Sequence, residues 1–287
     1  MPDLRFTVSQ AIQKWAARQL LNAYPRTWKR IIADFQENLG PDAFWLTYAA
    51  NYLLRTADVH WALDPLSLTS RVGQCTHLDF PQDLSSLQLI VLSHIHSDHL
   101  DPNLLAALRD LPITWVIPRF MRDQVLSILP VDPTRLIVPE PGVSITFGKL
   151  VLTPFNALHF SVKCLHGVPE MGYLAEFSGK RWLFPGDTRN YDIKALPDFG
   201  KLDGVLAHCW LGRGKALQPD ENIVSEFCQF YRSLDTARVI VTHLHDFGRG
   251  PDDFWGRNHF RLIKKHYNKL SPGAALGYAL MGSRITL

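Results

Sequence analysis

Helical periodicity dominates the first forty residues. One stretch carries apolar residues at the i, i+3, i+4 and i+7 spacing of an amphipathic helix, namely Trp28, Ile31, Ile32 and Phe35. Gly40 and Pro41 follow and would end this helix. An earlier helix around Trp15 would end at Pro25, because a proline inside a helix removes a hydrogen bond. We expect residues 1–42 to form an N-terminal helical extension that packs on the rest of the chain.

From about residue 44 the pattern changes to short apolar runs separated by turns, which is typical of strands. We predict strands in the stretches 44–56, 59–65, 87–93, 113–118, 135–140, 143–147, 149–160, 172–177, 180–187, 203–210 and 238–243. A turn at Asp58 would join the first two. A helix is predicted over 101–112 with Asp101 as its N-cap. Further helices are predicted over 119–129, 219–234 and 252–269. Such an order indicates sheets that pack on each other and are covered outside by helices.

The composition is that of an ordinary globular protein. The 287 residues are 46% hydrophobic and 20% charged, which allows a sizeable core and argues against disorder. The net charge of +3 does not by itself point to nucleic acid. The 4 cysteines form no C-x-x-C pair, the N-terminus lacks a signal-peptide apolar region, and no apolar run is long enough to cross a membrane. We expect a cytoplasmic protein with reduced thiols and no membrane span.

Three histidines and an aspartate stand directly behind the buried strand that ends at Ser93: His94, His96, Asp98 and His99. Imidazoles and a carboxylate bunched at a strand end are costly to bury without partners. A divalent metal ion supplies that partner, because neutral imidazole nitrogens and carboxylate oxygens are ligands that it prefers. The cluster therefore predicts a metal site.

The stretch SHIHSDHLD (93–101) resembles the H-x-H-x-D-H motif of the metallo-β-lactamase superfamily of metallohydrolases. The resemblance implies an α/β fold over residues 43–287, a four-layer αββα sandwich of two mixed β-sheets flanked by helices. It also implies a histidine after a later strand, an aspartate in a Gly-Asp-Thr-like turn and a histidine ending a strand near the C-terminus.

Each implied residue has a candidate. Asp187, in the turn Gly186-Asp187-Thr188, is similar to the family's bridging carboxylate. The best-known β-lactam-hydrolysing subclass has cysteine there, so Asp187 argues against that activity. His243 ends the strand 238–243 and is the expected C-terminal ligand. His245 is expected to lie behind that ligand or to face the substrate.

The middle histidine has two candidates. His159 ends a predicted strand, as in the family's third motif, and is preferred because a strand end holds its side chain rigidly. His166 lies in HGVPEMGY (166–173), which resembles a stretch of tRNA-processing RNase Z enzymes. The residue not used as a ligand would border the cavity. His208, at another strand end, is expected near the site without binding metal.

The family roles imply two adjacent metal sites. His94, His96 and His159 would hold one ion, Asp98, His99 and His243 the other, and Asp187 would bridge them. Zinc is expected, with manganese and iron as alternatives. A metal-bridging hydroxide would attack the substrate, and Asp98 is expected to be one of the catalytic residues. His166, His208 or His245 would supply a proton to the leaving group.

The resemblance implies a hydrolase acting on a phosphoester, a lactone or a related small ester. The alternatives are an RNase Z-like RNA endonuclease, a mono-iron oxygenase acting on a sulfur substrate, and a non-catalytic binding module. The near-neutral charge disfavours a nucleic-acid substrate. The N-terminal helices would either form a homodimer contact or border the pocket.

Overall fold

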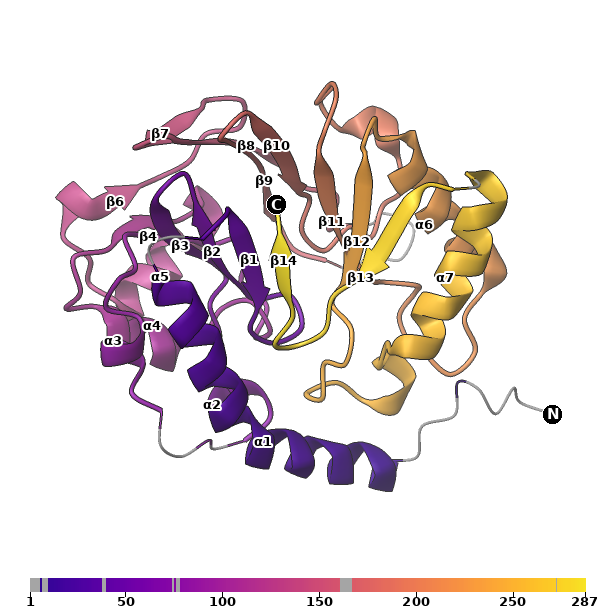
Figure 1. The fold of residues 1–287 in the computed structure, drawn as a ribbon, viewed down its shortest axis with the longest axis horizontal. Coiled ribbons are helices and arrows are strands. Elements are labelled where there is room, and N and C mark those ends of the chain that lie inside the picture. Colours follow the sequence, from indigo (N-terminus) through magenta and orange to yellow (C-terminus); the bar gives the residue numbers. More distant parts are fainter. Residues whose placement is uncertain are drawn as a thin grey trace.

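In the computed structural model, two β-sheets face each other and helices cover their outer sides (Figure 1). The structure describes residues 6, 10–37, 40–73, 75, 78–160, 167–271 and 273–287. The predicted α/β architecture of two mixed sheets flanked by helices is confirmed.

The first sheet combines an antiparallel half and a parallel half. Its strand order is β14-β1-β2-β3-β4-β5-β6, with antiparallel pairs from β14 to β3 and parallel pairs from β3 to β6. The bounds are β1 Ala43–Leu46, β2 Tyr52–Thr56, β3 Val59–Leu63, β4 Leu89–Val91, β5 Thr114–Val116, β6 Leu136–Ile137 and β14 Arg284–Thr286.

The second sheet is mixed in the same way. Its order is β13-β12-β11-β10-β9-β8-β7, antiparallel from β7 to β10 and parallel from β10 to β13. The bounds are β7 Ile145–Phe147, β8 Leu150–Asn156, β9 Met171–Phe177, β10 Lys180–Phe184, β11 Gly204–His208, β12 Arg238–Thr242 and β13 Ala275–Tyr278.

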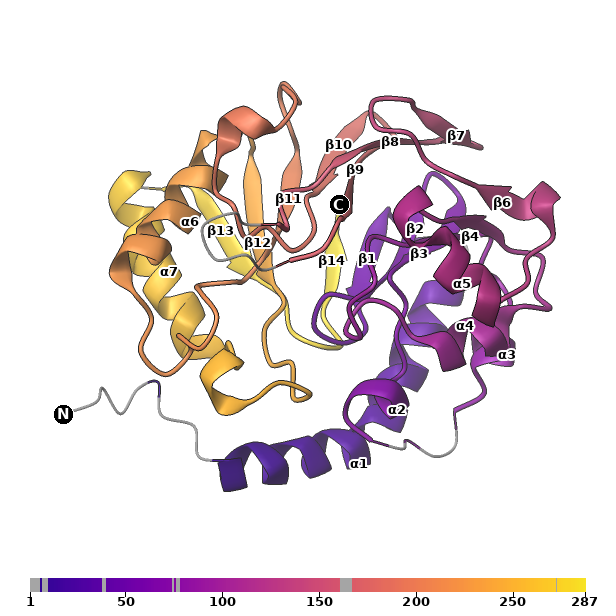
Figure 2. The same ribbon diagram turned by 180° about the vertical axis from the view of Figure 1, so that it is seen from behind.

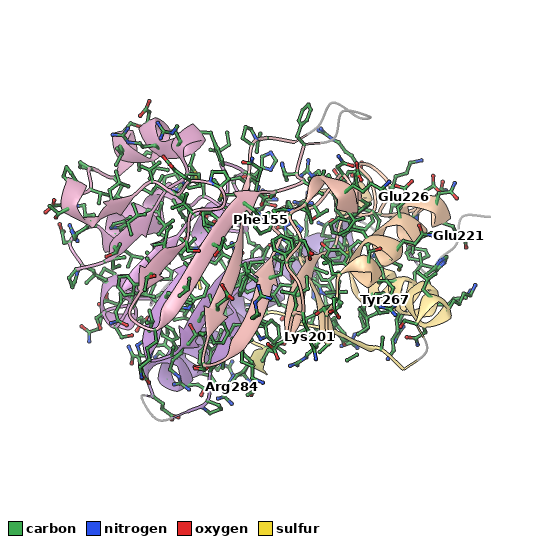
Figure 3. All side chains as sticks on the ribbon, turned by 90° about the horizontal axis from the view of Figure 1, so that it is seen from above. Phe155, Lys201, Glu221, Glu226, Tyr267 and Arg284 are labelled. Carbon is green, nitrogen blue, oxygen red and sulfur yellow. The ribbon has the colours of Figure 1, made fainter. Side chains whose placement is uncertain are left out.

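Three apolar layers hold these sheets and helices together. One lies between the sheets, a second lies between the first sheet and helices α1 to α5, and a third lies under α6 and α7. Figure 2 shows the two groups of helices on opposite sides, and Figure 3 shows Glu221 and Glu226 on the outer side of α6. The helices are α1 Gln10–Gln36, α2 Leu68–Arg71, α3 Phe80–Asp83, α4 Pro102–Leu108, α5 Arg122–Ile128, α6 Glu221–Ser233 and α7 Arg257–Leu270, with 3-10 turns η2 Arg119–Met121, η3 Pro133–Arg135, η4 Ile193–Ala195 and η5 Pro251–Asp253.

The N-terminal segment differs from its prediction, because α1 continues through Pro25 as one helix that bends along its length (Figure 1). A proline at this position leaves the carbonyl four residues earlier, that of Leu21, without its helical donor. The thiol of Cys75 lies 4.0 Å from that carbonyl oxygen, where it can donate a weak hydrogen bond. Apolar packing of the second half of α1 then outweighs the local cost.

The other predicted elements are present, but most are shorter than predicted. For example, β8 ends at Asn156 instead of Phe160, and α4 ends at Leu108 instead of residue 112. The Asp101 carboxylate accepts hydrogen bonds from the backbone N–H groups of Asn103 and Leu104, which confirms the predicted cap of α4. The predicted strand 44–56 is instead two strands, β1 and β2, separated by residues 47–51. The short strands β13 and β14 were not predicted. Within the described part of the chain, no helix is both long and apolar enough to span a membrane.

Helix α1 provides a direct test of the packing on the first sheet. Trp28 is buried, and its indole N–H donates to Asp83 Oδ2 over 2.7 Å. We predict that Trp28→Ala lowers the free energy of unfolding by about 3–5 kcal/mol, because it leaves a cavity and an unpaired carboxylate. Trp15, on the same helix, is 63% exposed. For Trp15→Ala, chemical denaturation should give a free energy of unfolding within about 0.5 kcal/mol of the unsubstituted protein. Equal losses of unfolding free energy in Trp28→Ala and Trp15→Ala would contradict this packing.

Candidate metal centre

The predicted metal ligands come from loops that follow strands of both sheets. The segment from His94 to His99 follows β4 of the first sheet. His159 follows β8, Asp187 follows β10 and His243 follows β12 of the second sheet. His243 has a backbone φ of 60°, an unfavourable value for a residue with a side chain. Such strain is typical of functional sites, and here the His243 N–H donates to the Ala49 carbonyl over 2.7 Å.

These residues meet in two overlapping groups. In each group the candidate ligand atoms lie within 4.8 Å of one another. Asp187 belongs to both groups and connects them. The first group is His94, His96, His159 and Asp187, and the second is Asp98, His99, Asp187 and His243.

Two buried nitrogen atoms test whether the residues fit a cation. His99 Nε2 and His159 Nε2 have no hydrogen-bond partner among the described residues. They lie 3.4 Å from Asp187 Oδ1 and 3.9 Å from Asp187 Oδ2, respectively. Leaving buried polar atoms unpaired is costly, and a metal ion bound beside Asp187 would satisfy both nitrogens. The donor set therefore fits divalent metal ions.

The protonation states favour metal binding at the first group. Burial lowers the pKa of His94 to about 3 and the pKa values of His96 and His159 to about 4. These imidazoles are therefore neutral at pH 7, which is the form that binds metal. Burial would raise the pKa of Asp98, but Arg249 and His243 hold it well below its usual value, so this carboxylate is ionised.

The second group favours positive charge. Burial alone would lower the pKa of His99, but Asp187 and Asp64 raise it well above its usual value. The two carboxylates thus stabilise a cation at this position, and a metal ion there would take the place of the proton.

Buried carboxylates orient two of the imidazoles. Asp64 Oδ2 lies 2.8 Å from His99 Nδ1, and Asp64 Oδ1 accepts the Ser93 N–H over 2.7 Å. Glu170 Oε1 lies 2.9 Å from His94 Nδ1. Because each Nδ1 is engaged, the Nε2 atoms are directed into the cluster. Carboxylates behind metal-binding histidines commonly fix ring orientation in this way.

Glu170 also holds the loop that carries Asp187. Both of its carboxylate oxygens accept the Asp187 N–H, at 3.1 and 3.0 Å. Burial raises the pKa of Glu170 to about 7. Gly186 has φ +74°, and a Cβ there would lie 2.3 Å from Glu170 Oε1. Glycine is therefore required at this position both for the backbone conformation and for the close approach of Glu170.

His208 is held against Asp187 rather than facing open space. Its Nδ1 is hydrogen-bonded to Asp187 Oδ1 over 2.9 Å, and its Nε2 to the Tyr52 hydroxyl over 2.8 Å. The same hydroxyl is hydrogen-bonded to Thr242 Oγ1 over 2.8 Å. Since both ring nitrogens are used, His208 is placed to orient Asp187.

Arg249 enters the centre from the loop after β12. Its Nη2 donates to Asp98 Oδ2 over 2.6 Å, and its Nε donates to Asp246 Oδ2 over 3.0 Å. Asp246 is buried and accepts two further bonds from Arg71, at 3.1 and 2.7 Å, and one from the Tyr48 hydroxyl at 2.9 Å. This network fixes a guanidinium beside the candidate ligand Asp98.

Of the remaining predicted residues, the structure describes His245. The ring of His245 packs beside Phe247 and Phe254, at centroid distances of 6.4 and 5.8 Å, and His245 is not part of the candidate metal groups among the described residues. His166 lies outside the described residues. Among the described residues, His159 is the histidine after β8 that belongs to a candidate metal group.

Sequence reasoning did not assign Glu170, Asp246 or Arg249 to the site. Glu170 lies within the stretch 166–173 that was examined for its histidine, directly before β9. Asp246 and Arg249 follow the predicted ligand His243 within six positions. Charged residues that close to a predicted ligand were the available signal.

Comparisons with known proteins agree with this geometry. Residues 64–244 match the model of the beta-lactamase superfamily domain. The N-acyl-phosphatidylethanolamine-hydrolyzing phospholipase D 1 of Caenorhabditis elegans is 24% identical over 250 residues, which cover 77% of this chain and 68% of that protein.

Solved structures show the same fold at low sequence identity. Igni18, a metallo hydrolase of Ignicoccus hospitalis, aligns with a TM-score of 0.62 and 16% identity, covering 86% of this chain and 99% of that one. CmlA, a diiron beta-hydroxylase from Streptomyces venezuelae, aligns with a TM-score of 0.61 and 14% identity, covering 88% of this chain and 55% of that one. Since the family model spans most of the chain, this protein belongs to the β-lactamase superfamily of metallo-hydrolases.

Proposed function

We propose that this protein is a dinuclear zinc hydrolase that cleaves a phosphodiester. The observation that carries the proposal is the position of Asp187, whose carboxylate lies within 4.8 Å of ligand atoms in both candidate groups. A single carboxylate with one oxygen directed to each group is the arrangement that two adjacent cations require. Ligands of this type suit zinc, and iron is the alternative that metal analysis would identify.

The residues would divide the work as follows. His94, His96 and His159 would hold one ion, Asp98, His99 and His243 the other, and Asp187 both. Bound metal ions would supply a hydroxide nucleophile at neutral pH by lowering the pKa of water. His208 would keep Asp187 in place through the bond to its Oδ1. We assign no proton transfer to His208, because both of its ring nitrogens are engaged.

Cationic side chains support a phosphate substrate. Arg249 Nη2 lies beside Asp98, and Arg189 Nη2 lies 3.9 Å from Asp187 Oδ2. Guanidinium groups bind phosphate oxygens with well-defined geometry and stabilise negative charge that develops during phosphoryl cleavage. The relative from Caenorhabditis elegans is named as a phospholipase D, whose reaction is the cleavage of a phosphodiester. These cations and this relative favour the phosphodiester over a lactone.

Removing the shared carboxylate charge tests the dinuclear site. We predict that Asp187→Asn reduces bound metal from two ions per chain to one or none and lowers phosphodiester turnover by at least about 100-fold, since both sites lose their common ligand. Elemental analysis together with a chromogenic phosphodiester assay would measure both. Asp110→Asn, at a carboxylate that is 89% exposed, is the matched control and should retain both properties. Unchanged metal content in Asp187→Asn would refute the shared-ligand assignment.

Glu170 gives a second prediction. Glu170→Gln keeps the side-chain size but replaces one carboxylate oxygen with an amide NH2, whereas both oxygens of Glu170 accept the Asp187 N–H and one of them also contacts the His94 ring. We expect metal affinity to fall about 10- to 100-fold. Competition with a calibrated chelator would measure it, and Glu140→Gln, at a side chain that is 64% exposed, serves as the control. Equal affinities in the two variants would show that Glu170 has no part in orienting the ligands.

A further inference from the structure

A hollow of about 330 Å³ lies between the first half of α1 and the segment 247–251. The charged residues in its lining, Lys14, Arg18 and Arg249, are all cationic. Leu21, Val72 and Phe247 form an apolar wall beside them. The volume is in the range of pockets that take small ligands. In both views of the ribbon the first half of α1 passes beneath the loop that follows β12 (Figure 1, Figure 2).

Arg249 connects this hollow to the metal centre. The residue lines the hollow, and its Nη2 also contacts Asp98 in the centre. Its contacts to described residues use Nε and Nη2, which leaves Nη1 to bind a ligand. A guanidinium in this position can bind an anion in the hollow while it remains anchored on the protein side.

Helix α1 and the arginine loop are joined directly. Gln13 is buried in α1, and its side-chain amide donates to the backbone carbonyl of Arg249. This bond fixes the exposed cations Lys14 and Arg18 at the outer side of the hollow. Of the residues that line the hollow, Val72 lies within residues 64–244, which match the superfamily domain, and the others lie outside that range, so most of the hollow is built by segments beyond the matched domain.

We propose that the hollow is an anion subsite that binds the phosphate-bearing part of the substrate, with Arg249 on the inner side and Lys14 and Arg18 at the rim. The inference rests on the proposed hydrolase and narrows its substrate to anionic phosphoesters. The rim cations Lys14 and Arg18 raise the local concentration of an anion and strengthen its binding. The charge of Arg249 is partly offset by Asp98 and Asp246, so this residue adds a directed hydrogen bond more than net charge. Neutral esters gain nothing from these charges.

The test compares two double variants of the full-length, metal-loaded protein. Lys14→Gln/Arg18→Gln removes two charges at the hollow. Arg26→Gln/Lys29→Gln removes two exposed charges from the same helix outside the hollow and is the matched control. Titration calorimetry with dibutylphosphinate, an anion whose P–C bonds cannot be hydrolysed, measures binding without turnover. We expect about tenfold weaker binding in the first variant, an unchanged dissociation constant in the control, and a smaller difference at high salt.

A kinetic measurement adds a second readout. For an anionic chromogenic phosphodiester we expect KM to rise about tenfold in Lys14→Gln/Arg18→Gln while kcat changes little, because the rim charges act on binding. Vesicles of phosphatidylcholine containing phosphatidylglycerol identify the source of the phosphate. Weaker binding to vesicles alone would assign the subsite to a lipid headgroup. Weaker binding of dibutylphosphinate alone would assign it to a soluble phosphoester.

The outcomes separate the subsite from the proposed reaction. Equal weakening in both double variants, or no weakening of binding to the soluble anion and to the vesicles in either variant, would overturn the subsite whatever the activity. Weaker dibutylphosphinate binding confined to Lys14→Gln/Arg18→Gln would support the subsite even if the protein cleaved no phosphodiester. The absence of cleavage would overturn the proposed function alone. Circular dichroism of both variants would verify that the exposed substitutions leave the fold intact.

Discussion

The bonds that hold the buried carboxylate of Asp187 in place determine the geometry of the whole centre. The backbone N–H of Asp187 donates a hydrogen bond to Glu170, and its Oδ1 is hydrogen-bonded to His208. Gly186, which precedes it, has a left-handed backbone conformation and no side chain, so Glu170 can approach closely. A buried carboxylate needs such compensation, because its transfer from water is costly. The surrounding imidazoles, His243 and His99 foremost, keep the pKa of Asp187 well below its usual value despite burial.

The packing of the two sheets supplies this compensation. The hydroxyl of Tyr52, in β2 of the first sheet, is hydrogen-bonded to His208 of β11 and Thr242 of β12 in the second sheet. Asn51, next to Tyr52, donates to the backbone carbonyls of Asp64 and Asp98 over 2.8 Å each. The contacts that close the sandwich are therefore also contacts that position the candidate ligands. A disturbance of the sheet interface would reach the metal centre through these bonds.

The sequence predicted the parts of the centre that a local pattern carries. A histidine-rich segment directly behind a buried strand is readable without a structure, and the positions of Asp187 and His243 at strand ends follow from apolar runs. Glu170 has no such pattern, because its role depends on the approach of β9 to the turn at Gly186. The role of Arg249 depends on the contact of its side chain with Asp98, 151 residues away in the sequence, which no local feature of the chain indicates.

The same distinction holds for the fold. The two-sheet sandwich and most helices followed from periodicity, whereas β13 and β14 are short and partly exposed and lack long apolar runs. At Pro25 the local rule predicted a helix end, but packing of Tyr24 and Trp28 against the first sheet favoured continuation. Tertiary contacts decided each of these cases.

The most direct test of the account is a crystal structure of the zinc-loaded protein with anomalous scattering at the zinc edge. We expect two peaks about 3.5–4 Å apart, with the Asp187 carboxylate between them. A single peak, or a pair of peaks that Asp187 does not touch, would contradict the account.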